Sequence, residues 1–161
     1  MIELTYWLMA SLVVPITGAL LISRLDKTPN VREAVTLITA VSLFAINIYL
    51  YLNLDNASKV NFSLAEPIEG LSISFALNSF GVMFALIASG LWIATSIYAI
   101  GYMRAHNESH QTRFFTLFAV AIAGVMAVAY SENLFTLFIF YEFLTVSTYP
   151  LVTHSGTPEA K

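Results

Sequence analysis

The stretch "FIFYEFLTVSTYPLV", residues 138–152, is a run of apolar and aromatic residues with one carboxylate, Glu142, near its middle. Together with residues 133–137 it reaches the length of roughly 20 residues that a helix needs to cross a lipid bilayer. A charged group inside such a helix is costly and therefore points to a function. The functional interpretation of the chain depends on what this carboxylate does.

The composition is that of a membrane protein. Of the 161 residues, 58% are hydrophobic and 11% are charged, and the mean hydropathy is +0.75. The net charge of −3 gives no basic surface for nucleic acid, so no nucleic-acid partner is expected. The chain has no cysteine, which excludes disulfides and thiolate chemistry. The first apolar run lacks a basic leader and is interpreted as a spanning helix rather than as a signal peptide.

Five apolar stretches are long enough to span the lipid bilayer, which predicts an all-α integral membrane fold. They cover residues 4–23, 34–54, 78–103, 114–130 and 133–153. Between the second and third stretches, apolar and polar residues alternate on both sides of a turn at residues 67–70. This pattern predicts a short β-hairpin on the outer side of the membrane.

The positions of Lys and Arg predict the orientation, because cytoplasmic loops carry the excess of these residues. Six of the seven fall on one side of the predicted spans: Arg24, Lys27, Arg32, Arg104, Arg113 and Lys161. Only Lys59 falls on the other side. We therefore expect a multi-pass protein of the inner (plasma) membrane, with the N-terminus outside and the C-terminus in the cytoplasm.

Glu142 is the only charged residue or histidine inside the predicted spans, and it lies nine residues after Asn133. At 1.5 Å per residue this is about 14 Å into the membrane, where an ionised carboxylate costs at least about 2.5 kcal/mol. Thr145, Tyr149 and Thr153 follow on the same helical face. This stripe of hydroxyls predicts a route for protons from Glu142 towards the cytoplasm.

Two interpretations of Glu142 remain open at this point. It is either a proton-transfer site or a neutral, hydrogen-bonded carboxyl that only joins helices. A proton site would need a movable cation, which either another polypeptide or a missing part of this chain would supply. His154, just beyond the fifth span, is a further proton-transfer candidate, with an ordinary interfacial histidine as the alternative.

The remaining motifs are weak. His106 and His110 have the i, i+4 spacing of a metal pair, but the segment "HNESH" is interpreted as a solvated polar loop. The sequence contains neither a phosphate-binding glycine loop nor a nucleophile elbow. We therefore expect no catalytic site, no metal site and no cofactor within this chain.

Four stretches, in this order and spacing, resemble the antiporter-like subunits shared by Mrp-type cation/proton antiporters, respiratory complex I and membrane-bound hydrogenases. They are "YAIGYM" (98–103), "RFFTLF" (113–118), "ENLFTLFIFYE" (132–142) and "LTVSTYPL" (144–151). Among these proteins they look most like the D-type subunits of Mrp antiporters and their hydrogenase-associated relatives. The resemblance implies that Glu142 is the fifth-helix carboxylate, which in that family works with a lysine on a later helix. Residues 1–161 would then be the N-terminal transmembrane segment of an antiporter-like protein, as a fragment or a truncated chain.

The leading hypothesis is a proton-translocating or cation/proton-translocating subunit in a hetero-oligomeric membrane complex. Its partners would be other membrane subunits and the lipid bilayer, and its ions would be protons with Na⁺ or K⁺ as coupling candidates. The complex itself could be an antiporter, a hydrogenase or a quinone oxidoreductase. The alternatives are a non-conducting structural subunit and a solute carrier, for which Asn47 is the main interior candidate.

Overall fold

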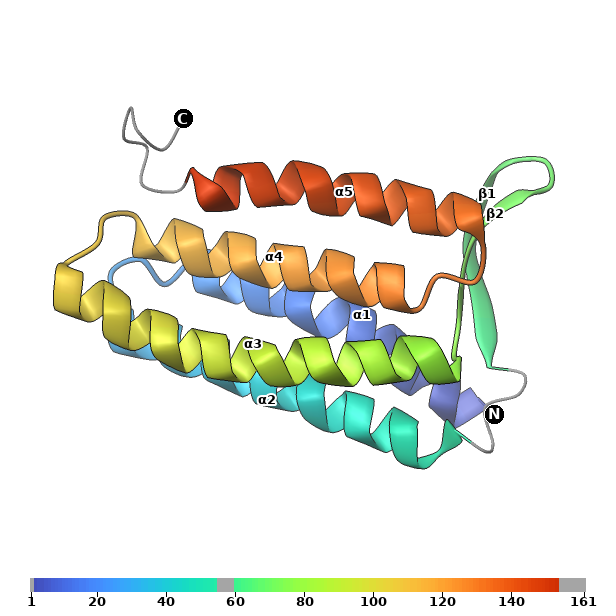
Figure 1. Ribbon diagram of the computed structural model, residues 1–161, viewed down its shortest axis with the longest axis horizontal. Helices are drawn as coiled ribbons and strands as arrows, with labels where there is room; N and C mark the ends of the chain where they lie inside the picture. Colours follow the sequence, from blue (N-terminus) through green and yellow to red (C-terminus); the bar gives the residue numbers. More distant parts are fainter. Residues whose placement is uncertain (1, 55–59, 154–161) are drawn as a thin grey trace.

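The computed structural model describes residues 2–54 and 60–153, which form five helices and one two-stranded hairpin (Figure 1). The elements in chain order are α1 (Ile2–Ser23), α2 (Pro29–Leu52), β1 (Asn61–Ile68), β2 (Leu71–Ala76), α3 (Ser79–His106), α4 (Gln111–Ala129) and α5 (Leu134–Val152). All five helices are long and apolar enough to cross a membrane. The predicted all-α membrane fold with a hairpin between its second and third helices is confirmed.

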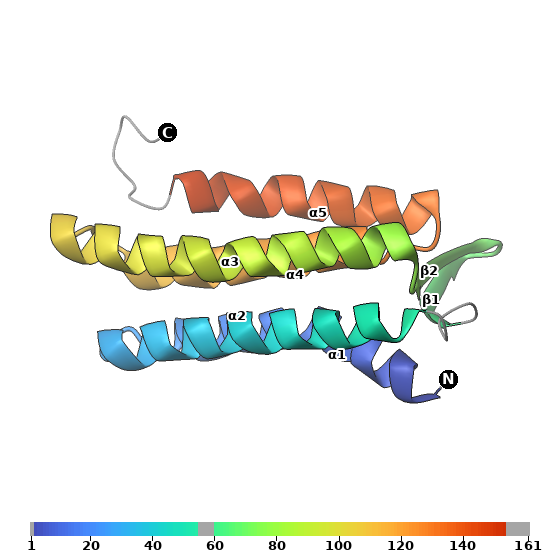
Figure 2. The same ribbon diagram turned by 60° about the horizontal axis from the view of Figure 1, so that its bottom comes forward.

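Consecutive helices run antiparallel, and the five lie in three layers (Figure 2). Helices α1 and α2 form one layer, α3 and α4 form the next, and α5 lies outside α4. Each of the first four helices packs on at least two others, whereas α5 packs on α4 and on β2. The chain is therefore a four-helix bundle with a fifth helix added on one side.

Small residues on α4 allow this close packing. Ala119, Ala123 and Ala127 are all buried, as their four-residue spacing predicts. Gly124 faces α5, and a Cβ built there would lie 3.1 Å from Cδ1 of Phe143. The stripe therefore brings both α1 and α5 close to the backbone of α4.

Helices α2 and α3 extend further than the hydropathy pattern predicts. Helix α2 begins at Pro29 rather than at residue 34, and α3 continues to His106. Proline is well tolerated in a first helical turn, and the charged side chains in these extra turns find partners in the fold. Glu142 is the only charged residue inside the predicted spans, but the longer helices also contain Arg32, Glu33 and Arg104 near their ends.

The hairpin is attached to the connection between α4 and α5. Its strands pair antiparallel, and Gly70 adopts a φ of 81° in the turn. The Ala76 N–H donates to the Tyr130 carbonyl at 2.9 Å, and the Glu132 N–H donates to the Ser74 carbonyl at 3.0 Å. These bonds fix the point at which α5 begins.

Candidate functional site

The first turn of α5 is held by side chains as well as by backbone. Asn133 caps the helix by accepting a hydrogen bond from the Thr136 N–H at 2.8 Å. The same amide donates to the Ser72 carbonyl at 2.9 Å. The Thr136 hydroxyl accepts from the Ser74 N–H at 2.9 Å. The hairpin therefore sets both the position of α5 and its rotation about its axis.

This rotation gives α5 one packed face and one open face. Thr136 and Ser147 are the only buried residues of the helix, which packs on β2 and on α4. The opposite side carries large exposed side chains, including Phe138, which is 61% exposed, and Tyr149, which is 65% exposed. The open face has no covering element within residues 2–54 and 60–153.

Glu142 lies on the open face, as the ninth of the 19 residues of α5. Its side chain is exposed, and among the described residues it has neither a hydrogen bond nor an ion pair. A carboxylate in the middle of an apolar helix needs water or a cation to remain ionised. The structure thus presents Glu142 outwards rather than sealing it between the helices that it describes.

Thr145 and Tyr149 are also exposed, on the same side of α5 as Glu142. The hydroxyl of Thr145 donates to the Tyr141 carbonyl at 3.0 Å, and that of Thr153 donates to the Tyr149 carbonyl at 3.0 Å. Each threonine oxygen keeps lone pairs that can accept a hydrogen bond from water. His154, the remaining proton-transfer candidate, lies outside the described residues.

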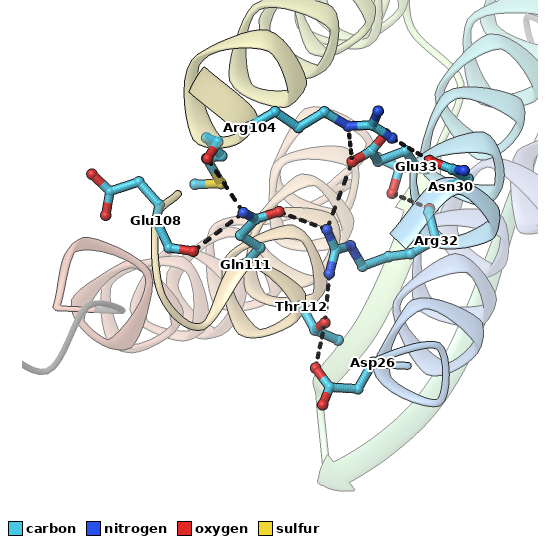
Figure 3. A network of polar contacts seen from close by, with 10 residues as sticks. Asp26, Asn30, Arg32, Glu33, Arg104, Glu108, Gln111 and Thr112 are labelled. Atoms are coloured by element: carbon cyan, nitrogen blue, oxygen red, sulfur yellow. Dashed lines mark hydrogen bonds and ion pairs between the residues drawn. The ribbon is translucent and has the colours of Figure 1, made fainter. Parts of the chain in front are cut away.

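A second polar site, which the sequence analysis does not identify, joins the helix ends opposite the hairpin (Figure 3). Arg32 is 3% exposed and donates to the Thr112 hydroxyl at 2.9 Å and to Gln111 Oε1 at 2.8 Å. Thr112 in turn donates to Asp26 Oδ1 at 2.7 Å. The guanidinium of Arg32 also lies 5.5 Å from the centre of the Phe115 ring. One buried cation therefore connects α2 to α4 and to the α1–α2 connection.

Glu33 continues this network to α3. Its carboxylate accepts from Arg104 Nε at 3.0 Å and also binds Arg104 Nη2. Glu33 Oε1 lies 3.7 Å from Arg32 Nη2, so the carboxylate is shared between two guanidinium groups. The signal in the sequence was the adjacent pair Arg32–Glu33 just before a long apolar run. Hydropathy alone assigned that pair to a loop.

Asn47, the candidate for solute binding, belongs to a buried polar cluster within the bundle. Its Oδ1 accepts from the Tyr130 hydroxyl at 2.8 Å, and its Nδ2 donates to Ser89 Oγ at 3.2 Å. Asn47 and Tyr130 are both fully buried. Because protein groups satisfy the Asn47 amide, the cluster joins α2, α3 and the end of α4 rather than leaving a free binding group.

The two histidines of "HNESH" are placed by separate elements. His106 is the last residue of α3, where Nδ1 lies 3.0 Å from the Tyr102 carbonyl and the ring stacks on Tyr102. His110 caps the start of α4 in the left-handed conformation, with a φ of 55°. The interpretation of the segment as a loop is wrong for His106, because α3 extends through it.

Comparisons with known proteins identify membrane proteins that are similar to this chain. Residues 68–115 match the family described as NADH-ubiquinone oxidoreductase (complex I), chain 5 N-terminus. The resemblance to antiporter-like membrane proteins is confirmed. The match runs from the hairpin turn to the first residues of α4 and so covers the elements that lead up to α4 and α5.

Three relatives show how much of such proteins the chain covers. This chain is 27% identical over 88 residues to a putative antiporter subunit mnhA2 of Staphylococcus haemolyticus. It is 30% identical over 88 residues to the A1 subunit of a Na(+)/H(+) antiporter of Staphylococcus aureus. These alignments cover 55% and 54% of this chain and 11% of each relative. It is also 25% identical over 108 residues to NADH-ubiquinone oxidoreductase chain 5 of Yarrowia lipolytica, over 67% of this chain and 14% of the relative. The chain thus spans about a tenth of the length of the curated relatives it matches.

The fold itself has a solved counterpart. A chain of the membrane-bound sulfane sulfur reductase, an archaeal respiratory membrane complex, superposes with a TM-score of 0.78 over 95% of this chain and 31% of that chain. The sequence identity is 16%, so this likeness establishes the fold alone. The antiporter relatives found by sequence are of the A type, whereas the motifs suggested the D type of Mrp antiporters.

Proposed function

We propose that this chain forms part of a membrane subunit that translocates protons, or exchanges cations for protons, within a multisubunit complex. Glu142 is the intramembrane proton site of this proposal, with Thr145 and Tyr149 as groups that order water beside it. Support comes from antiporter proteins and a complex I chain among the relatives. The decisive observation is the exposed carboxylate of Glu142 at the middle of an apolar helix, on a face that no described element covers.

The geometry favours proton exchange over a purely structural role for Glu142. A carboxyl that joins helices needs a polar partner on a neighbouring helix, and Glu142 has none within the described part of the chain. The rotation of α5 instead turns it to the side on which a further membrane element or a hydrated path would approach. Other membrane subunits, or further helices, would supply the cation that shifts its proton affinity.

The charge distribution supports the proposed orientation. The helix ends opposite the hairpin carry five cationic and three acidic described side chains: Arg24, Lys27, Arg32, Arg104, Arg113, Asp26, Glu33 and Glu108. The described charges at the hairpin end are all carboxylates: Glu3, Glu66, Glu69 and Glu132. By the positive-inside rule, the hairpin and the start of α1 face outwards and the end of α5 faces the cytoplasm of an inner (plasma) membrane.

Proton flux into vesicles that contain the complete complex tests this function. Replacing Glu142 with Gln keeps the size of the side chain but removes its exchangeable proton, so the flux should fall at least tenfold. Replacing Glu142 with Asp should retain part of the flux. The matched control is Glu69→Gln, which removes an exposed carboxylate from the hairpin turn and should leave the flux unchanged. An assembled Glu142→Gln complex with full flux would reject the proposal.

The second candidate is a structural subunit that conducts nothing. The observation in its favour is the ion network of Arg32, Glu33 and Arg104, which joins α2, α3 and α4 without a hydrogen bond or ion pair to the described residues of α5. A scaffold of this kind would lose assembly when the network is broken and would be indifferent to the charge of Glu142. The flux of the Glu142→Gln complex therefore separates the two functions.

A further inference from the structure

Helices α1 and α5 both pack on α4 but hardly on each other, which leaves a valley along α4. At the hairpin end this valley holds a cavity of about 420 Å³ with an almost wholly apolar lining. Its walls come from α1, α4, α5 and the hairpin and include Val13, Phe62, Ala123, Ala127 and Phe140. A hollow of this chemistry, open to the lipid between two spanning helices, suits a hydrocarbon chain.

The other end of the same valley is polar. A second cavity of about 630 Å³ lies there, bordered by Ser23 at the end of α1 and Asp26 after it, by Thr112, Arg113 and Thr116 of α4 and by Pro150 of α5. Arg113 is exposed and makes no hydrogen bond or ion pair with any residue that the structure describes. The Thr116 hydroxyl is shielded from solvent and also lacks a partner there. The cavity thus offers a free cation and a free hydroxyl at the membrane edge.

The distance between the two cavities matches a membrane lipid. Ala123 lies ten residues after Arg113 on α4, which is about 15 Å along the helix axis. This is half of a hydrocarbon core of about 30 Å, and therefore the depth of one leaflet. A phosphate at Arg113 would place its acyl chains along the valley, with their ends in the apolar cavity.

The charges at this end select the headgroup. Cationic side chains outnumber carboxylates there, whereas the described charges at the hairpin end are all acidic. The one carboxylate in the polar cavity, Asp26, already accepts from Thr112, which also accepts from the buried Arg32. Arg113 therefore meets an approaching phosphate without a competing ion pair. We propose that the valley between α1 and α5 binds an anionic phospholipid, with its phosphate at Arg113 and its acyl chains against Ala123 and Ala127.

Native mass spectrometry of the complete complex, purified from its membrane in mild detergent, tests this site. Phosphatidylglycerol and phosphatidylcholine with identical acyl chains are the probes. We expect preferential retention of phosphatidylglycerol, reduced roughly fivefold in Arg113→Gln, which is the effect of one cation beside an anionic headgroup. Val13→Trp, which fills the apolar cavity from a half-exposed position, should reduce the retention of that lipid as well.

Arg24→Gln is the matched control, because it removes a cation from the same end without lining either cavity, and it should change nothing. Equal retention of the two lipids, or equal loss in Arg113→Gln and Arg24→Gln, would overturn the proposal. Loss in Val13→Trp without loss in Arg113→Gln would reject the assignment of the headgroup to Arg113. A protein segment found in the valley in a structure of the complete complex would also reject it.

Discussion

Arg104 in the last turn of α3 and Glu33 in the second turn of α2 form an ion pair, although 71 residues separate them in the chain. The carboxylate of Glu33 is nearly buried, and the guanidinium of Arg104 is about half exposed. The pair closes the end of the bundle at which Arg32 joins α2 to α4. Helices α2, α3 and α4 and the α1–α2 connection are therefore held together at one end by charged side chains.

Breaking this pair should destabilise the bundle. Glu33→Gln leaves Arg32 and Arg104 without their shared carboxylate and should lower the free energy of unfolding by about 2–3 kcal/mol. Thermal unfolding of the purified protein in detergent measures the loss. The control is Glu108→Gln, at the same end of the bundle. The carboxylate of Glu108 makes no hydrogen bond or ion pair with any described residue, so its removal should have little effect on stability. Equal unfolding midpoints for the two variants would contradict the role of Glu33.

The hydrogen bond from Tyr130 to Asn47 should also contribute to stability. Tyr130→Phe leaves the buried Asn47 Oδ1 without its donor and should cost about 1–2 kcal/mol. Tyr141→Phe, on the exposed side of α5, should be nearly neutral. If the two variants unfolded at the same temperature, the Asn47 cluster would make no net contribution.

Replacing either of two glycines of α3 with alanine should have opposite effects on stability. A Cβ at Gly81 would lie 2.1 Å from the Ala129 carbonyl oxygen, so Gly81→Ala should separate α3 from α4 and cost about 1–3 kcal/mol. A Cβ at Gly101 meets nothing within 4 Å in the described structure, and alanine there should be neutral or stabilising by roughly 0.5–1 kcal/mol. Unfolding midpoints in detergent compare the two variants. Equal midpoints would show that α3 and α4 do not approach closely at Gly81.

Hydropathy was sufficient to predict the five helices and the hairpin, because lipid leaves few alternatives to a helix of about 20 apolar residues. It failed at Arg32, Glu33 and Arg104, because their partners lie on other helices and no local pattern reveals such pairs. Glu142 could be singled out as the one charge in the middle of a span. Its placement on the open face of α5 could not be predicted, because the hairpin sets that rotation through Ser72, Ser74, Asn133 and Thr136.

Exchange of a proton at Glu142 is the central claim, and infrared difference spectroscopy of the complete complex in lipid tests it most directly. Spectra recorded across a pH step should contain a carboxylic acid band that shifts in deuterium oxide. This band should disappear in Glu142→Gln and remain in Glu69→Gln. A Glu142→Gln complex that keeps every titrating carboxyl band of the unmodified protein would show that Glu142 does not exchange its proton.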